Sequence, residues 1–177
     1  DSGLLVYDKV SDNFNSLESR LLNSNSLSQI TAAFSDRSGL VWLGHRNGDI
    51  YVYNSRTGDA RKYGEKLSGE VSSFTQTPND DIYAVTKNGD IAYLNTDSSL
   101  KNHLYLEIFC KNTSQISAAY ALDDQNIWLG TTGNGLFLLD IRNGSCKQIA
   151  SPMSEAGNLA RANIQTIFSE PNSNITW

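Results

Sequence analysis

Apolar and polar residues follow one another in short runs that end at tight turns along most of this chain. The clearest case is the stretch 126–144, where the apolar runs Ile127–Gly130 and Leu136–Ile141 are joined by Asn134-Gly135. Asn-Gly between two β-type runs predicts a hairpin, because both central residues of the favoured turn need a positive φ. The stretch therefore predicts two antiparallel strands.

The same pattern recurs along the chain. Large aromatic residues stand 41, 45 and 49 residues apart, at Trp42, Tyr83, Trp128 and Trp177. A β-branched residue lies 12 or 13 positions before each of them, and a turn glycine lies six or seven positions after the first three. Agreement between three separate spacings indicates an internal repeat.

Each repeat contains up to four strand candidates. The first strands are Ile30–Phe34, Ile116–Tyr120 and Ile164–Phe168; the second are Leu40–His45, Asp81–Thr86 and Ile127–Thr131; the third are Ile50–Tyr53, Ile91–Leu94 and Leu136–Leu139; the fourth are Ala60–Tyr63, Tyr105–Cys110 and Cys146–Ile149. A period of this length with four short strands is typical of a β-propeller blade. We expect Trp42, Tyr83 and Trp128 to fill the layers between stacked blades.

We therefore predict an all-β fold: a partial β-propeller of three full blades plus two half-blades in one domain, 1–177. The blades are expected at about 26–66, 67–112 and 113–157, and the half-blades at about 1–25 and 158–177. In the first half-blade, Gly3–Asp8 matches a third strand and Asn15–Ser26 reads as a polar connection. We expect the chain to be a piece of a longer protein. The ring would be completed by further sequence, by a second arc, or by the two half-blades joining.

Composition and charge narrow the possible partners. The net charge is −5, the pI is about 4.9, and Lys and Arg form no cluster, which argues against nucleic acid as a partner. No apolar run approaches the roughly 18 residues that span a bilayer, so we expect no direct membrane contact from this segment. Unpaired strand edges favour self-association, or pairing with the remaining blades of the parent protein.

The two cysteines, Cys110 and Cys146, leave the redox environment open. Their predicted places on the outer strands of different repeats favour two free, buried thiols, because such strands are expected to lie too far apart to be bridged. A disulfide in an oxidising compartment is the alternative.

With the repeats aligned, the chain resembles the two-component regulator propeller family. The resemblance rests on Asp36-Arg-Ser-Gly-Leu-Val-Trp42-Leu-Gly44, on Ile127-Trp-Leu-Gly-Thr131 with Gly135–Asp140, and on Gly3-Leu-Leu-Val-Tyr-Asp8. The second repeat departs from the pattern, with Tyr83 in place of Trp, and His45 replaces the usual Thr in the first.

That resemblance implies a periplasmic sensor domain of a membrane-anchored hybrid histidine kinase. Many members of the family resemble regulators of polysaccharide use, so the resemblance also implies carbohydrate sensing and signal transduction. The matched residues are structural, and they transfer the fold but no ligand contacts.

Propellers commonly bind ligands where loops gather at one mouth of the central channel. Here we expect that mouth to carry the turns after the second strands and the connections 65–69, 111–115 and 154–163. The ligand-binding residues that this placement predicts are His45, Arg46, Lys87, Asn88, Thr131, Thr132 and Asn134. Each also has a structural explanation, because Asn shapes such turns and charged residues are ordinary on loops.

The sequence nominates no catalytic residue, metal ligand or cofactor. His45 and His103 are isolated, and the glycines open strands rather than helices. The turn Ser35–Trp42 resembles a sialidase-type Asp turn, but its acid comes one position early and Val41 replaces Thr. Asp36, Asp123 and Asp124 are expected to accept hydrogen bonds from backbone amides of their own turns.

Three functions are compatible with these observations. The leading one is a non-catalytic sensor propeller that recognises an oligosaccharide. The second is a scaffold for dimerisation or protein interaction. The third is a polysaccharide-acting enzyme, which lacks a recognisable pair of catalytic acids.

Overall fold

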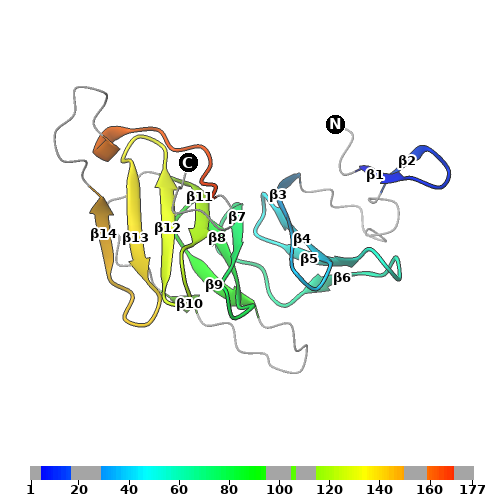
Figure 1. Cartoon of the computed structure of the whole chain (residues 1–177), viewed down its shortest axis with the longest axis horizontal. Helices are drawn as coiled ribbons and strands as arrows, with labels where there is room; N and C mark the ends of the chain where they lie inside the picture. Colours follow the sequence, from blue (N-terminus) through cyan, green and yellow to red (C-terminus); the bar gives the residue numbers. More distant parts are fainter. Residues whose placement is uncertain (1–4, 17–28, 95–104, 107–114, 150–158, 170–177) are drawn as a thin grey trace.

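The computed structural model describes residues 5–16, 29–94, 105–106, 115–149 and 159–169 of the 177-residue chain (Figure 1). Strands make up nearly all of its regular structure. Within the described residues, the single helical element is the short 3-10 turn η1 (Leu159–Arg161). The predicted all-β class is confirmed.

Twelve of the strands form three four-stranded antiparallel sheets, and each sheet is a simple meander in chain order. The first sheet contains β3 (Ile30–Ser35), β4 (Leu40–His45), β5 (Ile50–Asn54) and β6 (Ala60–Tyr63); the second contains β7 (Val71–Gln76), β8 (Ile82–Thr86), β9 (Ile91–Leu94) and β10 (Tyr105–Leu106); the third contains β11 (Ile116–Ala121), β12 (Asn126–Thr131), β13 (Leu136–Asp140) and β14 (Cys146–Ile149). The hairpin β1 (Leu5–Asp8) and β2 (Asn13–Ser16) forms a separate two-stranded sheet.

The predicted strands agree with the observed ones to within a residue at most ends. Two predictions need correction. The strand β2 falls partly inside the stretch 15–26 that we read as a polar connection, and Phe14 pairs there with Tyr7 of β1. The predicted strand 164–168 forms no regular strand, although a bridge joins Asn163 to Thr132 beside the third sheet. The residues 107–110 of the predicted fourth strand 105–110 lie outside the described residues.

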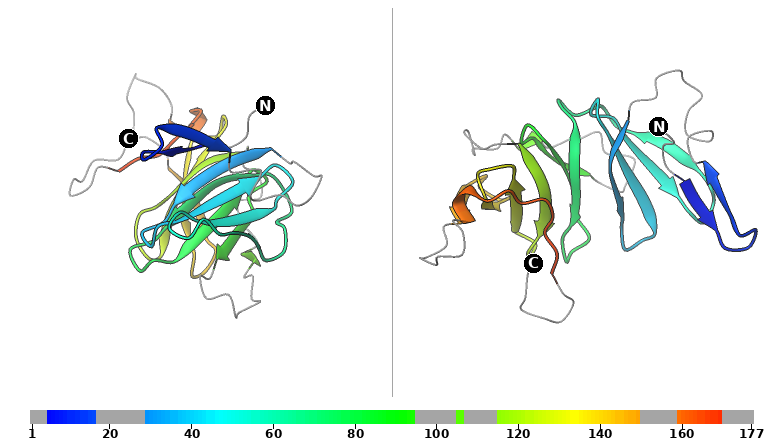
Figure 2. Two further views of the ribbon diagram at one scale, coloured as in Figure 1. Left: turned by 90° about the vertical axis from the view of Figure 1, so that its right-hand side faces the viewer. Right: turned by 90° about the horizontal axis from the view of Figure 1, so that it is seen from above.

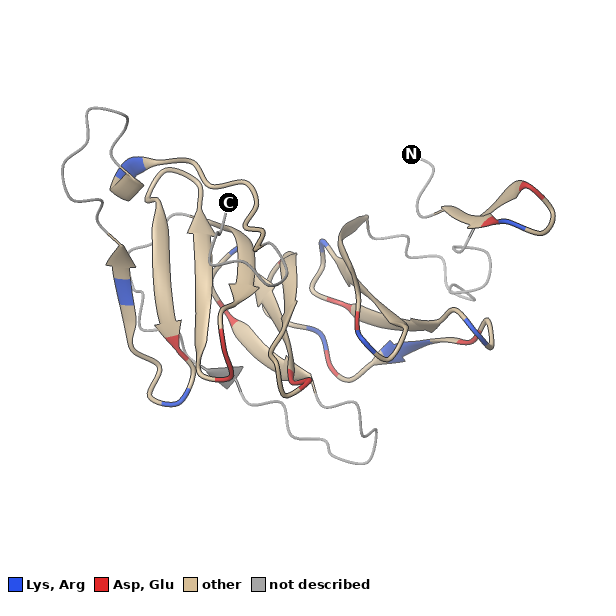
Figure 3. Ribbon diagram, viewed as in Figure 1, with Lys and Arg blue, Asp and Glu red and all other residues tan. Residues whose placement is uncertain are grey.

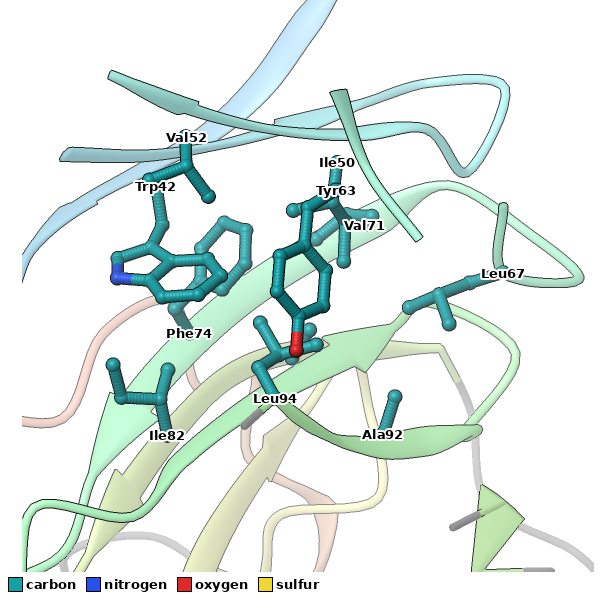
Figure 4. Close-up of a cluster of buried hydrophobic side chains, with 11 residues drawn as sticks. Trp42, Ile50, Val52, Tyr63, Leu67, Val71, Phe74, Ile82, Ala92 and Leu94 are labelled. Carbon is teal, nitrogen blue, oxygen red and sulfur yellow. The ribbon is translucent and has the colours of Figure 1, made fainter. Parts of the chain in front are cut away.

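The sheets stack face to face, and apolar side chains fill the layers between them. Between the first and second sheets, Trp42 packs edge-on to Tyr63 with ring centroids 5.1 Å apart (Figure 4). Tyr83 lies in the layer between the second and third sheets. Trp42 and Tyr83 therefore fill inter-sheet layers as predicted, whereas Trp128 is only half-buried on the outward side of the third sheet.

Small residues allow this close stacking. A Cβ atom on Gly44 of β4 would lie 2.4 Å from Cγ1 of Val71 in the next sheet. A Cβ on Gly130 of β12 would lie 2.5 Å from Cγ2 of Ile164. Real Cβ atoms do not approach other carbons so closely, so these two positions need glycine for the sheets to meet.

The first strands β3, β7 and β11 are the inner strands of the stack, and hydroxyl groups connect them to the unit that follows. Each has a β-bulge after its first residue. At the bulge, the hydroxyl of Thr31 donates to the carbonyl of Val71 at 2.7 Å, and that of Ser117 donates to the carbonyl of Ile164. The segment 163–169 therefore begins as the inner strand of a fourth unit would.

The three sheets follow one another in a row with the β1–β2 hairpin at one end and residues 159–169 at the other (Figures 1 and 2). Val6 of β1 packs on the outward side of the first sheet with Leu43 and Tyr53. Among the described strands, β1 pairs only with β2.

Candidate functional site

The turns between the second and third strands of the sheets, which we call the middle turns, carry the residues that the sequence singled out. The backbone amides of Arg46, Lys87 and Thr132 each donate to the residue just before the inner strand of their own sheet. The acceptors are the carbonyls of Gln29, Glu70 and Gln115, at 2.8 to 2.9 Å. This repeated bond places the middle turns at the same end of all three sheets, as predicted.

The two cations of the predicted set converge on one carboxylate. Lys87 Nζ lies 2.6 Å from Glu70 Oε1, and Arg46 Nε lies 3.9 Å from Glu70 Oε2. Arg46 belongs to the first sheet, whereas Glu70 and Lys87 belong to the second. Of these two pairs, only Arg46–Glu70 therefore crosses from one sheet to the next. Because Glu70 neutralises part of their charge, both cations are less available to an anionic ligand.

His45 is not presented on the surface. It is the last residue of β4, it is buried, and its ring lies 5.0 Å from that of Tyr51. Nearby, Asp49 accepts a bond from Asn47 Nδ2 at 2.9 Å and pairs with Lys62 Nζ at 2.7 Å. Burial by itself raises the pKa of Asp49, but the bonds from Lys62 and Asn47 outweigh it and hold the pKa below its usual range.

The other predicted residues mainly shape their turns. The buried Thr131 hydroxyl donates to the carbonyl of Gly135 at 2.8 Å and accepts the amide of Asn134 at 3.1 Å. Thr132 is exposed, and its hydroxyl donates to the carbonyl of Gln115 at 3.3 Å. Asn88 is exposed, and its amide group lies against Gly69.

A hollow of about 540 Å³ lies elsewhere, along the inner strands. Its walls come from β3, β7, β11 and the segment 165–167, and it reaches the turns that follow the inner strands, which we call the inner turns. We name it the inner-strand groove; it is lined by Phe34, Arg37, Ser73, Phe74, Thr75, Gln76, Pro78, Ser117, Ala118, Ala119, Tyr120, Ala121, Leu122, Gln165, Thr166 and Ile167. None of the seven sequence-predicted residues is among them.

The groove passes a position on the inner strands where the second repeat carries a smaller residue than its neighbours. Phe34, Thr75 and Tyr120 occupy the same register position in the three sheets, opposite Trp42, Tyr83 and Trp128 respectively. Thr75 thus stands where both neighbouring sheets carry an aromatic ring. Its hydroxyl accepts the amide of Ala121 at 2.6 Å, and the hydroxyl of Ser73 accepts that of Ala119 at 3.1 Å. Aligning the inner strands would have revealed this difference in size from sequence alone.

The groove is polar but almost uncharged. The strands β3, β7 and β11 contain no Lys, Arg, Asp or Glu, and charged residues gather in the turns and outer strands (Figure 3). Of the described residues that line the groove, only Arg37 carries a charge. Its Nη1 atom pairs with Asp80 Oδ1 and donates to the carbonyl of Thr77, both at 2.7 Å. The guanidinium is therefore held across the inner turns of two sheets.

Two acids of the inner turns, Asp36 and Asp123, act within their own turns. Asp36 accepts hydrogen bonds from Ser38 Oγ, from the backbone amide of Leu40 and from Trp42 Nε1. Asp123 accepts the amides of Gln125 and Asn126 in the same way. The predicted turn role of these two residues is confirmed, but the same prediction for Asp124 is wrong: Asp124 accepts the backbone amide of Asn79, in the inner turn of the second sheet, at 2.8 Å. An acid with its oxygens engaged in this way is poorly suited to proton transfer.

Cys146 corrects one expectation. It is disulfide-bonded, and no free cysteine occurs in the described part of the chain. The other cysteine of the sequence, Cys110, lies outside the described residues. The expectation of a free thiol at Cys146 is wrong, because Cys146 faces the layer between the second and third sheets rather than lying apart from the neighbouring sheet. Cys146 and Tyr93 of the second sheet both pack against the buried cluster in that layer.

No group of three or more potential metal ligands gathers among the described residues. In the same residues, no helix is long and apolar enough to cross a membrane.

Comparison with known proteins identifies the fold. No protein-family model matches the sequence, and no curated protein sequence does so with significance. Solved structures do match. The extracellular domain of a putative hybrid two-component system from B. thetaiotaomicron is similar to 86% of this chain, with a TM-score of 0.64 and 17% identity. Virginiamycin B lyase from Staphylococcus aureus is similar to 94%, with a TM-score of 0.68 and 14% identity.

A third match is the computationally designed protein Ika4, which is similar to 89% of this chain at a TM-score of 0.56 and 22% identity. The chain spans 22% of the two-component domain, 52% of the lyase and 88% of the designed protein. At these identities the likeness establishes the fold alone: four-stranded β-propeller blades, as predicted.

Proposed function

We propose that this chain is part of an extracytoplasmic sensor propeller of a hybrid two-component system, and that it recognises an oligosaccharide. The observation that carries the proposal is the structural similarity, over 86% of the chain, to the extracellular domain of such a system. The repeat motifs support it independently, because they resemble those of the two-component regulator propellers. The fold by itself would be equally compatible with a lyase, since one of the similar structures is a lyase.

The disulfide of Cys146 supports the extracytoplasmic location that we propose. Disulfides form and persist in oxidising compartments and are rare in the cytosol. A disulfide-bonded propeller is therefore expected outside the cytoplasmic membrane, where a sensor meets extracellular glycans. The parent protein would carry the histidine kinase activity and the membrane anchor in other segments.

The test is a calorimetric titration of the complete extracytoplasmic region with a panel of oligosaccharides. It is paired with a transcription reporter in cells that lack or carry the intact gene. Binding of one sugar class together with loss of its transcriptional response in the deletion strain is the expected result. A lyase or hydrolase activity on the sugar that binds would overturn the sensor proposal.

A second function, a dimerisation or protein-interaction scaffold, is favoured by the β1–β2 hairpin. Val10, Phe14 and Tyr7 are 97%, 62% and 46% exposed there, which is unusual for one small hairpin. Replacing Phe14 by Ser would weaken such an association. If Phe14→Ser abolishes dimerisation while sugar binding is unchanged, the hairpin serves assembly and the ligand is recognised elsewhere.

A further inference from the structure

We propose that the inner-strand groove is the place where this domain binds its sugar, and that the sugar is neutral. This inference rests on the proposed function and adds to it a site and a ligand charge. It also moves the site from the middle turns, where the sequence placed it, to the inner strands and inner turns.

The size and shape of the groove fit a small ligand. Its volume of about 540 Å³ lies in the usual range for ligand sites. Phe34 and Tyr120 stand at equivalent positions on either side of the small Thr75. Both rings are half-buried, so each is held by its sheet and still exposes part of its surface. Such rings suit the apolar C–H face of a sugar, which stacks on aromatic side chains.

The groove also offers polar groups that the fold does not use. Gln165 and Thr166 are exposed, and within the described residues their side chains make no hydrogen bond. The Tyr120 hydroxyl likewise makes no hydrogen bond within the described residues. An amide, a hydroxyl and a phenol can each donate and accept, which matches the mixed donor and acceptor character of sugar hydroxyls. By contrast, the hydroxyls of Ser73, Thr75 and Ser117 are engaged in linking the inner strands.

The charge of the groove selects the ligand class. Arg37 is paired with Asp80 and also donates to two backbone carbonyls, Thr77 and Pro78. A sulfated or uronic sugar would have to compete with these partners for the guanidinium. A neutral sugar requires no such exchange, so we infer a neutral oligosaccharide.

The experiment titrates the whole 177-residue chain by calorimetry with neutral hexasaccharides of glucose, xylose, mannose and arabinose. Oligogalacturonate and a heparin oligosaccharide form the charged set. Thr166→Trp fills the groove from an exposed position, so the fold is expected to survive, and thermal unfolding checks this. Ser145→Trp makes the same type of change at an exposed turn of the third sheet, away from the groove.

We expect at least one neutral hexasaccharide to bind, Thr166→Trp to weaken it at least about tenfold, and Ser145→Trp to change it less than about twofold. Tyr120→Phe, which removes only the hydroxyl, is expected to weaken binding by roughly three- to tenfold. Agreement of these three variants would support the groove as the site.

Two results would overturn the inference and leave the proposed function standing. One is a sugar that binds normally to Thr166→Trp but not to Thr132→Trp, which would return the site to the middle turns. The other is binding of the charged sugars alone. If no sugar of either set binds, the oligosaccharide part of the proposed function fails together with this inference.

Discussion

The indole Nε1 of Trp42 donates a hydrogen bond to Oδ2 of Asp36 at 2.8 Å, and both residues are buried. Asp36 belongs to the inner turn of the first sheet, and Trp42 fills the layer between that sheet and the next. One carboxylate therefore holds the turn and orients the aromatic ring on which the second sheet packs.

Replacing Asp36 by Ala should destabilise the fold. The change leaves the Trp42 indole and the amide of Leu40 without their acceptor in a buried place, so we expect a loss of about 2–3 kcal/mol in the free energy of unfolding. Urea unfolding measures it. Asp123→Ala is the matched control, because Asp123 also braces an inner turn but accepts no bond from Trp128. A loss at Asp36 no larger than at Asp123 would contradict the coupling between turn and ring.

The stability of the fold should fall in acid, in part through Asp36. Burial raises the pKa of Asp36, but hydrogen bonds from Ser38, Trp42 and Leu40 outweigh it and hold the pKa below its ordinary value. A lowered pKa in the folded state contributes stability above the unfolded value, near 4, and that contribution disappears as the pH falls through the folded pKa. In urea unfolding between pH 5 and pH 2, Asp36→Asn should show a shallower decline than the wild type. An identical decline would mean that Asp36 does not contribute.

Tyr83 should make the fold sensitive to alkali. Burial, reinforced by the nearby charges of Asp81 and of Tyr93, raises the pKa of Tyr83 to about 12. Because the unfolded value is about 10, stability is fully present below pH 10 and is lost as the pH rises towards 12. Ultraviolet titration of the phenols should show a tyrosine ionising near 12 that is absent from Tyr83→Phe. A wild-type curve equal to that of the variant would disprove the assignment.

A turn can need glycine because its φ is positive or because there is no space for a Cβ atom. Gly39 and Gly135 allow these two reasons to be compared. Both have positive φ, +71° and +88°, but only at Gly135 would a Cβ meet backbone, lying 1.8 Å from the carbonyl oxygen of Leu159. At Gly39 the nearest atom would be 3.8 Å away, at the end of the Arg56 side chain. We expect Gly39→Ala to cost about 1 kcal/mol and Gly135→Ala at least about 3 kcal/mol in chemical unfolding. Equal costs would show that backbone conformation alone matters.

The disulfide of Cys146 should stabilise the stacked sheets. A disulfide that closes a loop contributes about 2–4 kcal/mol, so Cys146→Ser should lower the free energy of unfolding by about that amount. Reduced wild-type protein should unfold at the same denaturant concentration as the variant. Titration with a thiol reagent in denaturant should find no free thiol before reduction. Two free thiols in the native protein would contradict the bond.

Local sequence was sufficient for the strands and turns. The ends of β4, β6, β9 and β14 agree with the predicted ones, because strand formation and Asn-Gly turns depend on neighbouring residues. β2 was missed because Asn13–Ser16 carries a single apolar side chain, Phe14, and so shows no alternation. It forms a strand because it pairs with β1, and its own sequence does not show that pairing.

The candidate site depended on contacts between repeats. Read along the chain, Arg46 and Lys87 are two unrelated cations, and only the stacking of the first two sheets brings both to Glu70. His45 looks like a loop residue in the sequence, yet it ends β4, whose last four residues are all buried. The residue types in a turn do not show whether a polar side chain is available to a ligand or is already paired with a residue of the next repeat.

The four-stranded repeats of this protein can be recognised from the amino-acid sequence alone, because the spacing, the turn residues and the aromatic positions are local and periodic. Tertiary structure decided the disulfide state of Cys146, the pairing of the charged turn residues, and the groove between Phe34 and Tyr120. The pair Arg46 and Glu70 and the pair Phe34 and Tyr120 each bring together residues of different repeats. They depend on how closely neighbouring units approach at Gly44 and Gly130. The sequence of one strand does not specify that distance of approach.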